Sequence, residues 1–373
     1  LKIGGRYRGK EKLRDNDFFE FEPTGGQFST LADVPLNDYS NPDYLAGRRY
    51  QIGNFATQRF LGDLDLQSAQ FDREVALDEF AADNFEATET ITGGYLMLTQ
   101  QFGDRTSAIA GVRVERTDNS YEGNLYNENT ETVEPTLGES DYTDIFPSIQ
   151  VRHELGDRTV LRGAWTNTIA RPNYFQLTPF RIIEDQEIEI GNPDLEPTRS
   201  MNFDVMFESY FTNVGIFQAG VFHKEISDFI IGRTVQTGFV AGVQFDEVTE
   251  PINGASARLT GFEIAFQRNL DFLPGLLSGL GVYANYTYTN SSVEDLGIEG
   301  RETEDLPLPG TSENTFNGSL SYDYGRVSLR ASVNFQDDFI DPGELGDDAF
   351  FDRYYEAQTQ VDLNGSIAIT RSA

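Results

Sequence analysis

The amino-acid sequence predicts an all-β fold, a transmembrane antiparallel β-barrel with long extracellular loops and short periplasmic turns. Two observations carry this prediction. Apolar and polar residues alternate over many segments of about ten residues, which is the pattern of strands with one apolar and one polar face. The segments that connect these strands are alternately short and long, which is typical of a barrel that crosses a bilayer.

The alternation is clearest from Val327 to Phe335, where every odd position is apolar and every even position is polar. Segments 280–289, 316–324 and 361–370 show a similar pattern. The pattern predicts strands near residues 1–8, 90–102, 107–116, 143–154, 159–168, 201–211, 215–225, 257–268, 279–290, 314–324, 327–336 and 358–370.

The connectors of these twelve strands differ in length in a regular order. Short turns at 103–106, 155–158, 212–214, 269–278 and 325–326 alternate with long segments. A β-sandwich has no reason to place every long loop at one end, whereas an outer-membrane barrel does. A soluble β-sandwich with the aromatic residues in its core stays open as the alternative. The long segments are 9–89, 117–142, 169–200, 226–256, 291–313 and 337–357.

The composition excludes several classes of function. The 373 residues include 61 acidic and 28 basic ones, so the net charge is −33, and this excludes non-specific nucleic-acid binding. The chain has no cysteine, and its two histidines, His153 and His223, are far apart, which argues against a metal site. We find no nucleophile–base arrangement and no phosphate-binding loop. We therefore expect no enzyme activity, no catalytic residues and no cofactor.

Much of the negative charge lies in three long connectors. Segments 117–142, 291–313 and 337–357 together hold 22 acidic residues and 2 basic ones, Arg301 and Arg353. One interpretation is a surface that stays soluble through repulsion. The other is that surface divalent cations bind the carboxylates and bridge them to lipopolysaccharide, since such cations prefer oxygen ligands.

Several segments resemble the TonB-dependent receptors of Gram-negative outer membranes. They include Asp144-Ile145-Phe146-Pro147-Ser148, Ile169-Ala170-Arg171-Pro172-Asn173-Tyr174 and Gly191-Asn192-Pro193-Asp194-Leu195-Glu196-Pro197. The resemblance extends from about residue 90 to the end of the chain. Within the family, the sequence is most similar to the oligosaccharide-type receptors of alphaproteobacteria and xanthomonads.

This resemblance implies a location, partners and an architecture. The family has 22-stranded barrels in the outer membrane, so residues 1–373 are expected to be one β-barrel domain that lacks the plug domain and the terminal strands. The implied partners are TonB with its inner-membrane energising complex, outer-membrane lipid including lipopolysaccharide, and the transported cargo.

We expect the two motifs of the resemblance to have structural roles. The prolines restrict the backbone where strands begin and end. Arg171 is expected to pair with a luminal acid or with the plug. The motif residues with this expected role are Arg171, Pro172, Asn192, Pro193, Asp194, Leu195 and Pro197.

Aromatic residues in the connectors are the candidate substrate-binding residues. They lie next to carboxylates and amides, and aromatic faces with a few polar groups are typical of a ligand site. Packing of the loops against themselves is the alternative explanation. The candidates are Tyr121, Tyr126, Tyr174, Phe175, Phe350, Phe351, Tyr354 and Tyr355.

The resemblance therefore implies TonB-dependent active transport of a scarce nutrient. A neutral oligosaccharide is the first cargo hypothesis, because of the connector aromatics and because the acidic connectors would repel an anionic cargo. A ferric siderophore is the second, and a structural or adhesive outer-membrane barrel is the alternative from another functional class.

Overall fold

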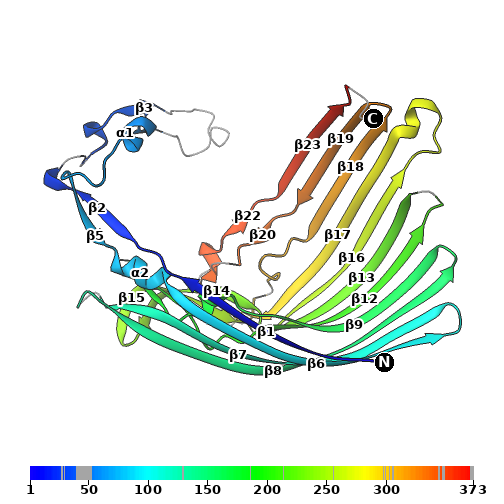
Figure 1. Ribbon diagram of the computed structural model, residues 1–373, viewed down its shortest axis with the longest axis horizontal. Helices are drawn as coiled ribbons and strands as arrows, with labels where there is room; N and C mark the ends of the chain where they lie inside the picture. Colours follow the sequence, from blue (N-terminus) through cyan, green and yellow to red (C-terminus); the bar gives the residue numbers. More distant parts are fainter. Residues whose placement is uncertain are drawn as a thin grey trace.

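The chain forms a large, curved antiparallel sheet, called the wall below, with smaller elements attached at one end (Figure 1). Within the described part of the chain, no helix has the length and apolar character needed to span a membrane. The computed structural model describes residues 1–26, 28, 30–38, 53–127, 130–184, 186–212, 214–254, 256–296, 298, 300–301, 303–304, 306–342, 345–346 and 349–369.

All twelve predicted strands are present in the wall, and each pairs antiparallel with the next one in chain order. The last one ends before the predicted residue 370, which lies outside the described residues. The wall strands are β1 (Lys2–Arg14), β6 (Phe85–Phe102), β7 (Thr106–Asn127), β8 (Thr132–Gly156), β9 (Thr159–Ala170), β12 (Thr198–Tyr210), β13 (Gly215–Ser227), β16 (Ser256–Asn269), β17 (Leu280–Asp295), β18 (Asn314–Tyr324), β19 (Val327–Gln336) and β23 (Gln358–Ile367).

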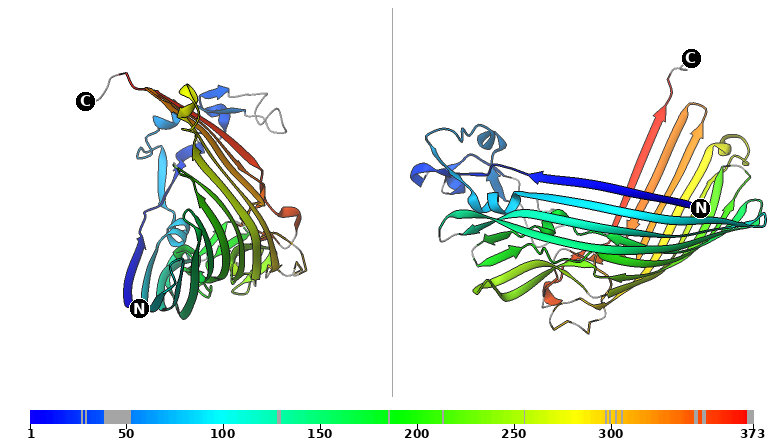
Figure 2. Two further views of the ribbon diagram at one scale, coloured as in Figure 1. Left: turned by 90° about the vertical axis from the view of Figure 1, so that its right-hand side faces the viewer. Right: turned by 60° about the horizontal axis from the view of Figure 1, so that its bottom comes forward.

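The wall is an open portion of a barrel, with β1 at one edge and β23 at the other (Figures 1 and 2). Its short connections lie at one end, called the turn end, and its long ones at the other, called the connector end. Gly103 and Gly325 have φ values of 64° and 61° in two of the short turns, a conformation that glycine adopts without strain. The predicted alternation of short and long connectors is confirmed except between β7 and β8, because β7 ends at Asn127 and β8 already begins at Thr132.

One face of the wall is apolar and the other is polar. In β8, Ile145 is 63% exposed on the apolar face, whereas the neighbouring Asp144 is only 7% exposed. The register places Trp165 opposite Ile149 and Phe203, so this tryptophan lies on the apolar face. In a membrane barrel, this face contacts lipid and the polar face lines the lumen.

The prediction of a long acidic loop over 117–142 is wrong. β7 and β8 continue through most of this segment, with Tyr121 opposite Gly138 and Asn127 opposite Thr132. Residues on both faces of this extension are largely polar, so the apolar alternation that marks a membrane strand is missing. Backbone hydrogen bonds still join the two strands because a ladder needs no apolar side chains.

The other long connectors also contain regular elements that we predicted as loops. Most of these elements are too short for a period-two pattern to stand out. The two strands of eleven residues among them, Ile230–Val240 and Val243–Asn253, do not alternate strictly between apolar and polar residues. The paired strands are β2 (Phe19–Pro23) with β5 (Phe71–Val75), β3 (Leu36–Asp38) with β4 (Asn54–Ala56), β10 (Arg181–Glu184) with β11 (Glu187–Ile190), β14 (Ile230–Val240) with β15 (Val243–Asn253), and β20 (Phe339–Ile340) with β22 (Tyr354–Tyr355). The remaining elements are β21 (Leu345–Gly346), α1 (Gln58–Gly62), α2 (Leu77–Asp83), α3 (Tyr174–Leu177) and the 3₁₀ turns η1 (Thr24–Gly26), η2 (Leu31–Asp33), η4 (Gly275–Gly279) and η5 (Ala349–Phe351).

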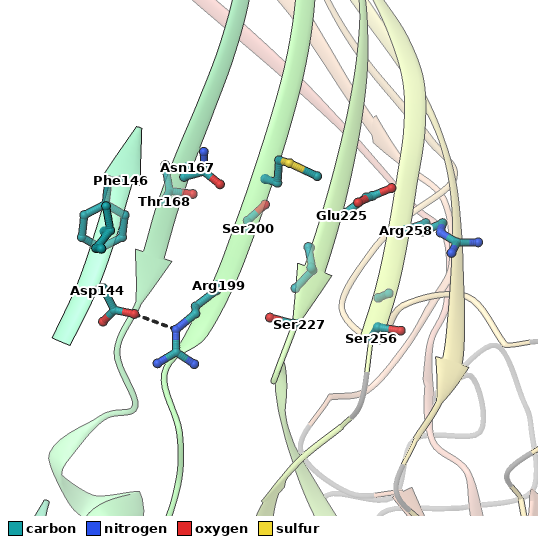
Figure 3. A pocket seen from close by; sticks show the side chains of 14 residues that line it. Asp144, Phe146, Asn167, Thr168, Arg199, Ser200, Glu225, Ser227, Ser256 and Arg258 are labelled. Atoms are coloured by element: carbon teal, nitrogen blue, oxygen red, sulfur yellow. Dashed lines mark hydrogen bonds and ion pairs between the residues drawn. The ribbon is translucent and has the colours of Figure 1, made fainter. Parts of the chain in front are cut away.

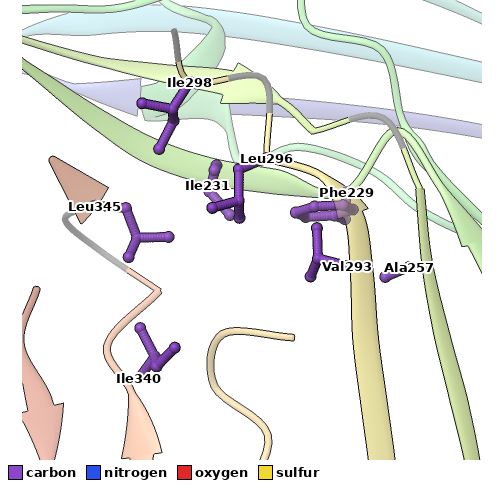
Figure 4. Close-up of a cluster of buried hydrophobic side chains, with 8 residues drawn as sticks. All are labelled: Phe229, Ile231, Ala257, Val293, Leu296, Ile298, Ile340 and Leu345. Carbon is purple, nitrogen blue, oxygen red and sulfur yellow. The ribbon is translucent and has the colours of Figure 1, made fainter. Parts of the chain in front are cut away.

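Two hydrophobic clusters organise the connector end. The first joins segments that are distant in sequence (Figure 4): the start of β14, the start of β16, the end of β17, β20 and β21. The second joins β6 and β7 to α3 and to Leu195. The first cluster consists of Phe229, Ile231, Ala257, Val293, Leu296, Ile298, Ile340 and Leu345, and the second of Phe85, Ala87, Tyr121, Leu177 and Leu195.

Candidate functional site

The structure divides the predicted substrate-binding aromatics into two groups. The first group surrounds α3, where Tyr174 and Phe175 pack against the second cluster. Tyr121 belongs to that cluster and is only 1% exposed, so its ring faces are covered by protein. Phe175 stacks on Phe180 with ring centroids 4.3 Å apart. Tyr126 lies near the end of β7 and is half-buried.

Arg171 enters a network of buried polar groups beside this first group. Its Nη2 donates to Oε2 of Glu115 at 3.1 Å and to the hydroxyl of Thr117 at 3.0 Å. Its Nε lies 3.8 Å from Oε2 of Glu89. Glu89 is 5% exposed and also accepts hydrogen bonds from Arg8 and from the Tyr174 hydroxyl. Arg171 thus holds the start of the β9–β12 connector against β6 and β7.

The Asn192–Pro197 motif connects three parts of the connector end. The Asn192 backbone N–H donates to the carbonyl of Gln176 in α3, and its side chain donates to the Pro251 carbonyl. Leu195 is 4% exposed in the second cluster. The Glu196 N–H donates to Asn253 Oδ1 at 2.8 Å. Pro172 and Pro197 are buried, Pro193 is half-buried, and Asp194 is exposed.

The second aromatic group surrounds a pocket at the connector end. Tyr354 lines it and is 54% exposed, and Phe339 lines it from the facing strand. Tyr355 stacks on Phe339 with a centroid distance of 4.9 Å. Phe350 is 84% exposed on η5 and does not line the pocket, and the side chain of Phe351 lies outside the described residues.

This pocket combines aromatic surface with many oxygen and amide groups. Its cavity volume is about 550 Å³. Asp337 accepts a hydrogen bond from Asn314 Nδ2 at 2.8 Å, which fixes the position of its carboxylate. We missed Phe339 in the sequence, although it follows two carboxylates directly. The pocket is lined by Thr289, Asn290, Ser291, Ser292, Pro307, Thr311, Glu313, Asp337, Asp338, Phe339, Ile340 and Tyr354.

A buried ion pair lies close in the chain to Tyr354 of the pocket. Arg301 is 2% exposed, and its Nη1 and Nη2 donate to the two carboxylate oxygens of Asp352, each at 2.7 Å. Glu304 accepts two further hydrogen bonds from the same guanidinium. These hydrogen bonds, first of all those with Asp352, raise the pKa of Arg301. The pair joins the β17–β18 connector to the chain two residues before Tyr354.

A second pocket opens in the wall itself, with a cavity volume of about 360 Å³ (Figure 3). It lies where the β8–β9 ladder stops, at the pair Ser148 and Thr166. Arg199 Nε donates to Asp144 Oδ1 at 2.7 Å in this opening, and Arg199 also pairs with Asp228 at 3.3 Å. The other two charged residues of the lining, Glu225 and Arg258, pair with His223 and Glu294 outside the pocket.

β1 carries a row of basic residues that the search for apolar alternation does not detect. The register with β6 places Arg8 opposite Ile91 and Lys10 opposite Glu89, on the polar face of the wall. A period-two search for charge, in place of apolar character, would have found this row. Its members are Lys2, Arg6, Arg8, Lys10, Lys12 and Arg14.

Acidic side chains do not gather into a recognisable metal site. Among the described residues, no group of three or more aspartate, glutamate or histidine side chains is placed to hold a metal ion. Cation binding at the acidic connectors stays a prediction.

Comparison with known proteins identifies similar barrels. A family model described as "TonB dependent receptor-like, beta-barrel" matches residues 1–371. No curated protein sequence matches the chain.

Solved structures share the fold at low sequence identity. The ferric-catecholate import receptor Fiu of E. coli K12 has a TM-score of 0.57 and 13% identity over 90% of this chain and 44% of its own. The siderophore receptor PiuA of Acinetobacter baumannii has a TM-score of 0.55 and 11% identity over 86% and 43%. The copper transporter OprC has a TM-score of 0.54 and 18% identity over 76% and 41%. The chain thus spans less than half the length of these proteins.

Proposed function

Because the chain belongs to the TonB-dependent receptor β-barrel family, we propose that it forms part of an outer-membrane transporter that takes up an oligosaccharide. In this proposal the wall spans the outer membrane of a Gram-negative bacterium, and its connector end faces outward. TonB supplies energy through a plug domain in the lumen. The protein acts as a transporter and not as an enzyme.

The observation that carries the oligosaccharide proposal is the pocket between β17, β20 and β22. A sugar ring has apolar C–H faces and a rim of hydroxyl groups. Phe339 and Tyr354 offer aromatic surface for the faces, and Asp337, Asp338 and Glu313 offer acceptors for the hydroxyls. A pocket with apolar platforms and a few well-placed polar groups is the usual form of a small-molecule site.

The two faces of the wall and its backbone hydrogen bonds support the proposal of transport across a membrane. Its apolar face suits lipid, and its polar face suits a water-filled passage. Backbone hydrogen bonds between neighbouring strands satisfy the polar groups that a bilayer cannot. Arg171 and the Asn192–Pro197 motif are proposed to hold the connectors around the passage, as their buried contacts indicate.

A ferric siderophore is the second candidate cargo. Fiu and PiuA, which share the fold, are named as receptors for such compounds. Within this chain, the specific observation in favour of an anionic chelate is the basic row on β1.

The test uses the complete gene product, isolated from membranes in detergent. Calorimetric titration with neutral oligosaccharides and with ferric siderophores is compared for the wild type and for Tyr354→Ala. We expect saturable sugar binding that is about tenfold weaker in the variant, because truncation of an aromatic anchor commonly has such an effect.

The matched control is Phe350→Ala, which removes an equally aromatic side chain that is 84% exposed and does not line the pocket. It should leave sugar binding unchanged. If the protein binds ferric siderophores but no sugar, the proposal of an oligosaccharide cargo is wrong, whereas the proposal of a transporter is unaffected. Recovery of the protein in the soluble fraction would contradict the proposal that the wall spans a membrane.

A further inference from the structure

The pocket between β17, β20 and β22 is lined by negative charge alone. Its cavity of about 550 Å³ is bordered by the carboxylates of Glu313, Asp337 and Asp338, and its lining includes no lysine or arginine. A cleft lined by charge of one sign concentrates ligands of the opposite sign. The charge of this pocket therefore favours a cationic ligand over a neutral or an anionic one.

The basic residues of the surrounding connectors do not offset this charge. Segments 291–313 and 337–357 together contain fifteen acidic residues and only two basic ones, Arg301 and Arg353. The guanidinium of Arg301 is 2% exposed and is hydrogen-bonded to two carboxylates outside the lining. Arg353 precedes Tyr354 in the chain but does not line the pocket. The connectors thus extend the negative field of the pocket.

The carboxylates of the pocket are held separately from one another. Asp337 accepts a hydrogen bond from Asn314 Nδ2 at 2.8 Å, and the Tyr288 hydroxyl donates to Glu313. Asp338 is exposed and, within the part of the chain that the structure describes, forms neither an ion pair nor a side-chain hydrogen bond. Among the described residues, no three carboxylates or histidines are placed to hold one metal ion. The arrangement suits a larger ligand that carries several positive groups.

The aromatic residues of the pocket favour the same charge. The face of an aromatic ring carries partial negative charge and attracts an ammonium group, and it also packs against the apolar face of a sugar ring. Phe339 and Tyr354 supply such faces. An ammonium group has three hydrogen-bond donors and no acceptor, so it matches carboxylates better than a hydroxyl group does. A sugar that carries ammonium groups therefore fits both kinds of side chain.

The pocket does not owe its exposure to an open edge of the wall. None of its lining residues lies on β1 or β23. The strands β17, β18 and β19, which border it, pair with a neighbour on each side. Ile340 lines the pocket and is 2% exposed in the first hydrophobic cluster, so the packing of that cluster fixes the base of the pocket.

We infer that this pocket binds an oligosaccharide that carries ammonium groups, so that the cargo is a cationic and not a neutral sugar chain. This inference rests on the proposed function and names the class of sugar that the same pocket takes. Asp338 accepts hydrogen bonds from an ammonium group of the sugar, and Phe339 and Tyr354 contact the C–H faces of its rings. The acidic connectors attract the cargo before it reaches the pocket.

The experiment compares two sugars that differ in charge. Cello-oligosaccharides and the fully deacetylated oligomers of chitin, called amino oligomers below, have the same backbone, but in the amino oligomer an ammonium group replaces one hydroxyl group of each ring. Both are titrated into the complete gene product in detergent, at a pH at which the amine is protonated. The wild type should bind the amino oligomer more tightly, and high salt should reduce this preference.

The test variant is Asp338→Asn, which keeps the size of an exposed side chain and removes its charge. It should bind the amino oligomer about fivefold more weakly, the size expected for one exposed ion pair, and bind the cello-oligosaccharide unchanged. The matched control is Glu134→Gln, which removes one negative charge from an exposed position of β8 outside the pocket. It should keep the preference for the amino oligomer.

The outcomes separate this inference from the proposed function. If the wild type binds neutral sugars at least as tightly as the amino oligomer, and Tyr354→Ala weakens that binding, the inference is wrong and the oligosaccharide transporter stands. An equal loss of the preference in Asp338→Asn and Glu134→Gln would also overturn it, because the attraction would then come from the net charge and not from the pocket. Binding of neither the amino oligomer nor any neutral sugar would contradict the proposed function itself.

Discussion

The wall and the connector end place the same kinds of side chain in opposite environments. In β23, Val361 and Leu363 are 66% and 78% exposed on the apolar face. In the connector between β19 and β23, Ile340 and Leu345 are 2% and 0% exposed. The wall exposes its apolar side chains, as a strand that faces lipid does. The connector end buries them in small hydrophobic cores, as a protein surrounded by water does.

The largest expected effect concerns the buried ion pair of the connector end. Arg301→Gln leaves the Asp352 carboxylate buried without its bidentate partner. Loss of one partner of a buried pair costs about 3–5 kcal/mol. We expect fast amide hydrogen exchange in the connectors around η5 and β22, while the wall stays protected. Arg59→Gln, which removes an exposed partner of Asp63, should leave exchange unchanged; similar exchange in both variants would show that the pair does not stabilise this end.

The next effect concerns the lipid-facing side of the wall. Val333→Arg places a charge in the middle of the apolar face of β19, where such a change costs about 2–4 kcal/mol. Ser332→Arg, one residue earlier, places the same charge on the polar face. We expect only the first variant to lower the denaturant midpoint of the refolded protein in lipid. Equal sensitivity at both positions would contradict the assignment of the two faces.

A smaller effect is expected where the Asn192–Pro197 motif is attached. Asn253 donates to the carbonyls of Glu196 and Asp228 and accepts from the Glu196 N–H. Asn253→Ala removes these three hydrogen bonds, of which the two with Glu196 are exposed and the one to Asp228 is partly buried. We expect a total cost of about 1–2 kcal/mol, since a single hydrogen bond contributes about 0.5–1.5 kcal/mol. The measurement is the rate of limited proteolysis between residues 186 and 200, which should increase in Asn253→Ala. Asn253→Asp keeps one acceptor and should show a smaller increase in this cleavage rate. No change in either variant would mean that water replaces the asparagine.

The smallest effect tests the packing of the first cluster. Ile340→Val removes one buried methylene at a position that is 2% exposed, and such changes cost about 0.5–1.5 kcal/mol. The rate of amide hydrogen exchange should rise modestly in β20 and in the part of β14 that packs in the same cluster. Val361→Ala on the exposed face of β23 is the comparison, and a larger effect there would reverse the contrast between the two regions.

The sequence by itself determined the wall. Residues 314–324 and 327–336 are predicted and observed as strands with identical limits. Alternation along a strand is a local property, because successive side chains point to opposite faces whatever lies beyond them. The positions of the short turns and of Val333 and Ser332 on opposite faces follow from the same period.

Only the tertiary structure decided the connector end and the roles of its aromatic residues. Tyr121 and Tyr354 look alike in sequence, as tyrosines near carboxylates, yet one is 1% exposed and the other 54%. Which of them is covered depends on Leu177 and Leu195, which lie more than fifty residues from Tyr121. The pocket likewise needs Phe339 and Tyr354 to meet through the β20–β22 pairing. Such contacts between distant segments leave no periodic trace in the sequence, because burial there is fixed by packing and not by the repeat of a single strand.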